Sequence, residues 1–343
     1  MNLNGIWLAR LSDPVGLNET IRPVAYRTNF TDSFEKLLAL SGAHNVRPAL
    51  VRNLRKQLQQ APQHLISAPH DQLEKIASLI MSRAEETRLL EFARTALLFD
   101  TAAEIMAEVA KQDLPAVIVK GPDFADAAYG GIEWRNFSDV DILVAPEAHE
   151  ALCAILIAND FQAVEPRTKR LNYGERAFLR KSFGGNLLVE VHTDLVHAPE
   201  LRAAQTLNYA LYAGPEYGGV TPAARLVLAG LHGATSHLFG RLQYVVDGLM
   251  IARTNVDGDE LRERAKQTGA TLAVATMLRL AHEIYGSPEA ANLLEKLGAF
   301  KWSGFERWLI PRSVVLSAKD DDRWRRLPQR YLYRRLLRQH SGS

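Results

Sequence analysis

Apolar residues recur with two different periods along the chain, and these periods distinguish helices from strands. In residues 71–111, and again from residue 222 onward, they recur every three or four positions, as is typical of amphipathic helices. Between these regions, short apolar runs rich in β-branched residues lie at 114–121, 139–144 and 186–194. Such runs predict buried strands. The order of elements therefore predicts an α+β protein with helical regions on both sides of the strands.

This pattern divides the chain into three expected regions. Residues 1–110 form an N-terminal, mostly helical region, 111–200 the core that contains the strands, and 201–343 a C-terminal helical region with a basic tail. Residues 1–30 mix Pro, Asn and Gly with scattered apolar positions, which favours irregular segments. The helix of residues 71–111 is expected to contain one break.

Two aspartates at the start of one strand are the first candidate for chemistry. Side chains alternate along a strand, so Asp139 and Asp141 are expected on one face and Val140 on the other. Two neighbouring carboxylates suit Mg²⁺, which prefers oxygen ligands and often coordinates the phosphates of a substrate at the same time. An isolated D-x-D is also compatible with two solvated acids, so the neighbouring elements decide its meaning.

The strand at 114–121 ends in a glycine turn that leads into a short helix. Pro122 suits the first turn of that helix, where no backbone N–H is needed. Gly121 at a helix N-terminus allows backbone amides to approach phosphate oxygens, and Lys120 adds a cation there. An ordinary turn at the end of a strand is the alternative.

A third acid lies inside the strand at 186–194. Alternation places Leu188, Glu190 and His192 on one face of this strand. A carboxylate in an apolar strand needs a cation or a hydrogen-bond partner. Glu190 is therefore expected either to form a salt bridge to a buried arginine or to serve as a third metal ligand.

Together these elements resemble the DNA polymerase β-like nucleotidyltransferase superfamily, and in particular a bacterial family known as uncharacterised nucleotidyltransferases. The matching segments are Val119-Lys120-Gly121, the small-residue helix from Ala125 to Tyr129, Arg135-Asn136-Phe137-Ser138-Asp139-Val140-Asp141-Ile142-Leu143-Val144, Glu190-Val191-His192, His232, and the R-L-x-x-x-x-D step from Arg241 to Asp247. The wider superfamily usually has Gly-Ser at the turn, whereas this chain has Gly121-Pro122 and lacks that hydroxyl.

The resemblance implies a small mixed sheet and a metal-dependent reaction of class EC 2.7.7.-. A nucleoside monophosphate would pass from an NTP, such as ATP, to an acceptor by a two-metal mechanism with release of pyrophosphate. The implied catalytic and metal-binding residues are Asp139, Asp141 and Glu190, with Mg²⁺ or Mn²⁺ as cofactor. The implied nucleotide-binding residues are Lys120, Gly121, Arg135, Ser138 and His232. Arg135 could instead pair with an acid, and His232 could instead be a core histidine.

Composition is consistent with a cytoplasmic enzyme. The 343 residues are 47% hydrophobic and 23% charged, which is ordinary for a globular protein, and the formal charge of +2 does not indicate a dedicated nucleic-acid binder. Cys153 is the single cysteine, so no intramolecular disulfide can form. The sequence shows neither a secretory signal nor an apolar stretch long enough to span a membrane.

The basic tail leaves alternative functions open. From residue 323 onward, arginines alternate with aromatic and aliphatic residues, including Leu327, Tyr331, Leu332 and Leu336. This pattern suits a final helix with its apolar face on the core, or a segment that contacts RNA or a membrane. The alternatives to an enzyme are thus an inactive nucleotide-binding regulator and an RNA-interacting protein. The sequence indicates neither the oligomeric state nor which acceptor is used among small molecules, peptides or proteins, and tRNA.

Overall fold

The chain combines one mixed sheet with many helices, as the hydrophobic periods predict. The computed structural model describes residues 3–16, 30–60, 70–164, 175–182, 185–196, 198–298, 304–316 and 327–339. The helices before the sheet are α1 (Leu3–Leu11), α2 (Phe30–Ala43), α3 (Arg47–Gln60) and α4 (His70–Lys111). The sheet region contains β1 (Ala116–Val119), α5 (Gly121–Ala127), β2 (Val140–Val144), α6 (His149–Ala158), β3 (Gln162–Ala163), β4 (Glu175–Ser182) and β5 (Gly185–His192). The later helices are α7 (Tyr209–Ala213), α8 (Pro222–Leu231), α9 (Leu242–Ala252), α10 (Gly258–Gln267), α11 (Thr271–Tyr285), α12 (Pro288–Lys296), α13 (Gly304–Leu309), α14 (Arg312–Val315) and α15 (Leu327–Gln339).

The sheet is mixed, and its two central strands carry the candidate acids. The strand order is β1-β2-β5-β4-β3. β2 and β5 run parallel, while the other neighbouring pairs are antiparallel. The D-x-D strand therefore lies directly beside the strand that contains Glu190, in register, with Asp141 opposite Glu190.

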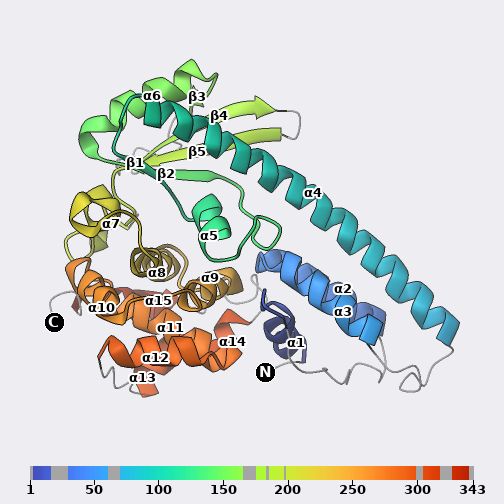
Figure 1. The fold of residues 1–343 in the computed structure, drawn as a ribbon. Coiled ribbons are helices and arrows are strands. Elements are labelled where there is room, and N and C mark those ends of the chain that lie inside the picture. Colours follow the sequence, from blue (N-terminus) through green and yellow to red (C-terminus); the bar gives the residue numbers. More distant parts are fainter. Residues whose placement is uncertain are drawn as a thin grey trace.

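The two faces of the sheet belong to different hydrophobic cores. Val140, Ile142 and Val144 point into a core shared with α4 and α6. Leu143 and Val119 belong to a second core that contains buried residues of α8, α9 and α11. In Figure 1 the sheet with α6 lies at the top and the C-terminal helices lie at the bottom, with α5 between them. The expected alternation along β2 is thus observed, and Asp141 lies on the face toward the C-terminal helices.

The N-terminal segment departs from the sequence-based expectation. Residues 3–11 form helix α1, although the composition of residues 1–30 favours irregular structure; residues 17–29 lie outside the described part of the chain. Leu8 and Leu11 are fully buried in the core of the C-terminal helices. Long-range packing therefore stabilises a helix that local propensity does not favour.

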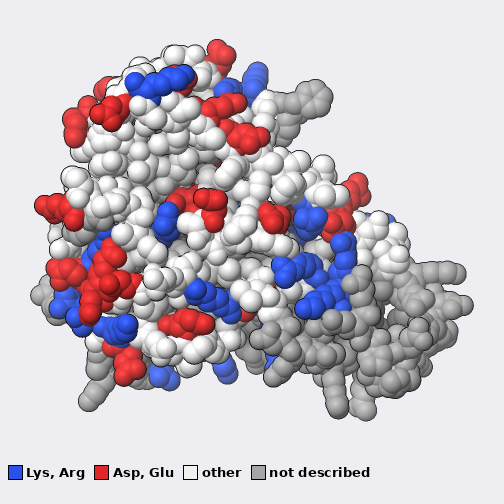
Figure 2. All heavy atoms as spheres, in the orientation of Figure 1, with Lys and Arg blue, Asp and Glu red and all other residues white. Residues whose placement is uncertain are grey.

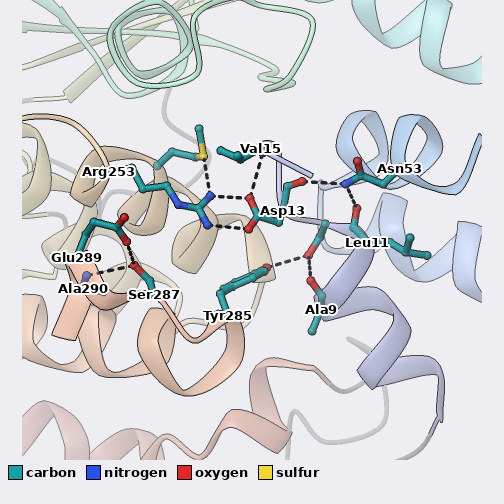
Figure 3. A network of polar contacts seen from close by, with 12 residues as sticks. Ala9, Leu11, Asp13, Val15, Asn53, Arg253, Tyr285, Ser287, Glu289 and Ala290 are labelled. Carbon is teal, nitrogen blue, oxygen red and sulfur yellow. Dashed lines mark hydrogen bonds and ion pairs between the residues drawn. The ribbon is translucent and has the colours of Figure 1, made fainter. Parts of the chain in front are cut away.

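Polar contacts join this segment to two of the C-terminal helices (Figure 3). Arg253 donates from both terminal nitrogens to the two carboxylate oxygens of Asp13, at 2.6 and 2.7 Å. The hydroxyl groups of Ser12 and Tyr285 are 2.8 Å apart. These contacts join the end of α1 to α9 and α11.

Helix α4 connects the sheet to the N-terminal helices. It is continuous over 42 residues, so the expected break is wrong. Its later turns pack on α6 and the sheet, and its earlier turns pack on α2 and α3 (Figure 1). Among the described residues, no helix has both the length and the apolar character that a membrane span requires.

The tail forms a helix that packs on the core. In α15, Tyr333 and Leu337 are buried, and the Tyr333 hydroxyl donates to Thr276 Oγ1 at 2.8 Å. Tyr331, which the apolar spacing assigns to the packed face, is 63% exposed, whereas Leu332 and Leu336 pack against the core as expected. The described part of the tail thus follows the packed-helix interpretation with a rotated apolar face.

Candidate active site

All eight sequence-predicted site residues line one cavity between the sheet and the C-terminal helices. The cavity has a volume of ≈ 380 Å³. Its lining includes the predicted residues Lys120, Gly121, Arg135, Ser138, Asp139, Asp141, Glu190 and His232. Residues more than 100 positions apart therefore meet at one place.

The acids come from two adjacent strands. Asp141 and Glu190 are direct partners in the parallel register of β2 and β5, so their side chains leave the sheet on the same face. Asp139 lies just before β2 and lines the same cavity. Among the described residues, Asp141, Glu190 and His192 form a group of potential metal ligands, with one ligand atom from each lying within 4.8 Å of the others.

Asp141 is the most strongly held acid of the site. Its Oδ1 accepts a hydrogen bond from Lys120 Nζ at 2.9 Å and lies 2.8 Å from His192 Nε2. Burial alone would raise the pKa of Asp141, but the opposite charge of Lys120 and the contact with His192 outweigh it and hold this pKa well below its usual range. Asp141 is therefore a fixed negative charge at the base of the cavity.

The other two acids behave differently. Burial raises the pKa of Asp139, and the neighbouring charge of Asp141 raises it further. The same two causes, burial first and Asp141 second, raise the pKa of Glu190 to about 8. A divalent cation in this cavity would relieve the repulsion among the three carboxylates, so the donor set fits such an ion.

The turn that bears Lys120 has an unusual backbone. Lys120 has φ 59° and ψ −116°, a conformation that non-glycine residues rarely adopt. Gly121, which begins α5, is packed so tightly that a Cβ there would lie 3.0 Å from Phe137 Cγ. Close packing thus gives one reason for glycine at this position, and the turn aims the Lys120 ammonium group at Asp141.

Arg135 is held by a buried acid. Its Nε and Nη2 donate to the two carboxylate oxygens of Asp247, at 2.7 and 2.9 Å, and its Nη1 donates to Gly121 O at 3.1 Å. The Tyr129 hydroxyl also donates to Asp247, at 2.7 Å. Burial alone would lower the pKa of Arg135, but Asp247 outweighs it and raises the pKa. Arg135 thus pairs with an acid, which is the alternative that the sequence offered to direct nucleotide binding.

The segment between Arg135 and Asp139 is fixed from both helical regions. Asn136 Nδ2 donates to Glu91 Oε2 on α4 at 2.8 Å, and Glu91 also pairs with Arg47 on α3. The backbone oxygen of Asn136 accepts from Asn45 Nδ2 and from Gln243 Nε2, both at 3.2 Å. The N-terminal helices and α9 therefore jointly position the approach to the D-x-D strand.

The helical side of the cavity contains residues to which the sequence assigned no role. Arg241 lines the cavity, and within the described residues its side chain forms no ion pair. His237 and Tyr244 lie beside His232, and Glu175 lies across from His192 on β4. Alternation along β5 places His192 beside Glu190. Arg241 and Tyr244 lie in a segment that resembles the family pattern, but local spacing does not bring them or His237 to the acids, because helix packing places them there.

The surface around these elements has no dominant sign of charge in the view of Figure 2. Acidic and basic side chains are interspersed over this face. This mixture agrees with the formal charge of +2.

Comparison with known proteins identifies one family. The family model described as uncharacterised nucleotidyltransferase matches residues 31–286, which include every residue of the cavity lining. No curated protein matches the chain, and no solved structure does so.

Proposed function

Since the chain belongs to this family of uncharacterised nucleotidyltransferases, we propose that it transfers a nucleoside monophosphate from an NTP to an acceptor and releases pyrophosphate. The observation that carries the proposal is the meeting of Asp139, Asp141 and Glu190 in one cavity with cationic side chains. Carboxylates that hold a cation, next to cations that bind phosphate, are the groups that phosphoryl chemistry requires.

The three carboxylates are the proposed holders of Mg²⁺ or Mn²⁺. Asp141 and Glu190 lie side by side in register, and Asp139 lies at the same mouth of the cavity. His192 contacts Asp141, so it is either a fourth ligand or the group that orients this carboxylate. When bound, the metal would neutralise phosphate charge and favour ionisation of the acceptor hydroxyl.

Arg241 is the proposed cation for the triphosphate. Lys120 pairs with Asp141 and Arg135 with Asp247, so both cations already neutralise buried carboxylates. Arg241 lines the same cavity and forms no such pair within the described residues. Its planar guanidinium group suits two-point contact with phosphate oxygens.

In the proposed step, the acceptor oxygen forms a bond to the α-phosphorus of the NTP, and the bond from this phosphorus to the bridging α–β oxygen breaks. Pyrophosphate leaves with that oxygen, and the acceptor hydroxyl loses its proton. Glu190 is the proposed proton acceptor, because its carboxylate lines the same cavity as the other two acids.

The test combines the purified protein with labelled NTPs, Mg²⁺ or Mn²⁺ and a cell extract, and identifies labelled products by mass spectrometry. Asp139→Asn is the test variant, since Asp139 forms no ion pair within the described residues and the change adds no bulk. Asp259→Asn is the matched control, because the Asp259 side chain is 81% exposed on α10 and lies outside the cavity. Labelled product with wild type and the control, but not with Asp139→Asn, supports the proposal. NTP binding without any product would favour a nucleotide-binding regulator.

A further inference from the structure

Three aromatic side chains form a stack on the helical side of the cavity. His232 begins a π-helical turn, His232–Ser236, directly after α8, and Tyr244 lies in the first turn of α9. The His237 and Tyr244 rings are stacked, with centroids 4.6 Å apart and planes 11° apart. The His232 ring meets both edge-on, at 4.9 and 5.2 Å. All three residues line the cavity that contains the candidate catalytic acids.

The stack has a buried end and an exposed end. Tyr244 is 6% exposed, whereas His237 is an exposed residue, so the open aromatic surface belongs to His237. Ser236 also lines the cavity, and its Oγ is shielded from solvent without a hydrogen-bond partner among the described residues. A buried hydroxyl that lacks a partner is unfavourable, and a polar ligand atom would satisfy it.

The backbone that presents these groups is constrained. Leu238 and Phe239 both have positive φ angles, 49° and 51°, which is uncommon for apolar residues. Phe239 is fully buried, and a Cβ on Gly233 would lie 2.5 Å from its ring. π-Helical turns and strained backbone conformations often lie at functional sites, where the surrounding structure holds them in place.

We propose that the nucleobase of the NTP stacks on the exposed face of the His237 ring, which packs against Tyr244 and His232 on its other sides. This inference rests on the proposed function and deepens it by separating the cavity into two ends. Every nucleobase has a π-face that stacks on an aromatic ring. Ser236 Oγ, which can donate or accept a hydrogen bond, is available for a polar edge of the base or for the ribose. Arg241 is four positions after His237 in the chain and lines the same cavity as the acids. A triphosphate bound to Arg241 would therefore extend from the nucleobase toward the acids.

The test separates the base from the phosphates. Isothermal titration calorimetry of the full chain in Mg²⁺ compares α,β-methylene ATP, which cannot transfer its nucleotide, with inorganic tripolyphosphate, which has no base. We expect His237→Leu to weaken binding of the ATP analogue by about tenfold, the effect of losing one base–aromatic stack, and to leave tripolyphosphate binding unchanged. His237→Phe retains a ring and should retain the affinity for the analogue.

Tyr331→Leu is the matched control, because it removes an exposed aromatic ring that does not line the cavity and should alter neither affinity. Thermal melts of each variant verify folding, which is expected because His237 is exposed. Unchanged affinity of His237→Leu for the analogue would overturn the nucleobase assignment, as would an equal loss for both ligands. If the wild-type protein bound neither ligand, the proposed function would fail together with this inference. Normal binding by His237→Leu with slower transfer would instead assign the stack to the acceptor.

Discussion

Replacing Arg135 with glutamine removes one half of a buried ion pair and leaves the Asp247 carboxylate without its opposite charge. The Arg135 and Asp247 side chains are only 7% and 4% exposed, and two hydrogen bonds at 2.7 and 2.9 Å join them. Removing one partner of such a pair typically costs about 3–5 kcal/mol. Domains are stable by only about 5–15 kcal/mol, so Arg135→Gln is expected to lose a large share of the free energy of unfolding.

Urea unfolding, followed by circular dichroism and tryptophan fluorescence, measures this loss as a lower midpoint. The double variant Arg135→Met/Asp247→Leu should cost less than the sum of the two single variants, since it leaves no buried charge without a partner. Arg262→Gln is the matched control, because Arg262 and Asp259 form an exposed pair on α10, with side chains 46% and 81% exposed. Such a pair contributes at most about 1 kcal/mol.

The opposite pattern would refute this reasoning. If Arg135→Gln kept the wild-type urea midpoint and lost only nucleotidyl transfer, the guanidinium group would serve the phosphates and the pairing with Asp247 would be incidental. Additive costs in the double variant would likewise contradict a direct interaction between the two side chains.

Three further predictions concern the acids and the tail. Asp139→Asn should abolish transfer and leave the urea midpoint unchanged. Asp141→Asn should lower both the transfer rate and the urea midpoint, because it leaves the buried Lys120 ammonium group without its carboxylate. Equal stability of the two variants would contradict this difference. With a pKa of about 8 against an ordinary 4.5, Glu190 keeps a proton in the folded state that the unfolded chain releases. The free energy of unfolding of the metal-free protein should therefore fall as pH rises from 4.5 to 8. Glu190→Gln should reduce this slope, and Asp139, whose pKa is also raised, should account for part of what is left, as urea titrations at several pH values would reveal. Deleting residues 323–343 should lower the melting temperature more than it changes tRNA affinity in gel shifts at two salt concentrations; a folded deletion variant that loses tight low-salt binding would instead assign the tail to RNA.

The strand pattern made the core of the site predictable. Alternation along two apolar strands was enough to place Asp141 on one face of β2 and Glu190 on one face of β5, because a strand has only two faces. The family resemblance then predicted that the two strands contribute their acids to one site. The same alternation placed His192 beside Glu190, so its contact with Asp141 required only the strand order.

The helical contributions were not predictable in the same way. A helix has a broad apolar stripe, and spacing alone did not distinguish Tyr331 from Tyr333 as the buried ring of α15. The pairing of Arg135 with Asp247 joins positions 112 residues apart through packing of α9 against α5. Helix α1 likewise depends on distant partners rather than on its own propensity.

The division of the sheet between two cores has a consequence for synthesis on the ribosome. Among the described residues, the buried members of the core shared with α4 and α6 extend from Leu98 to Val191, so this core can close once β5 has emerged. The opposite core includes Leu8 near the beginning of the chain and Leu337 near its end. The lining of the cavity ends at Tyr244, so the acids on that face of the sheet remain uncovered until α9 has emerged, and the core on that side is completed only when the last helix packs on it.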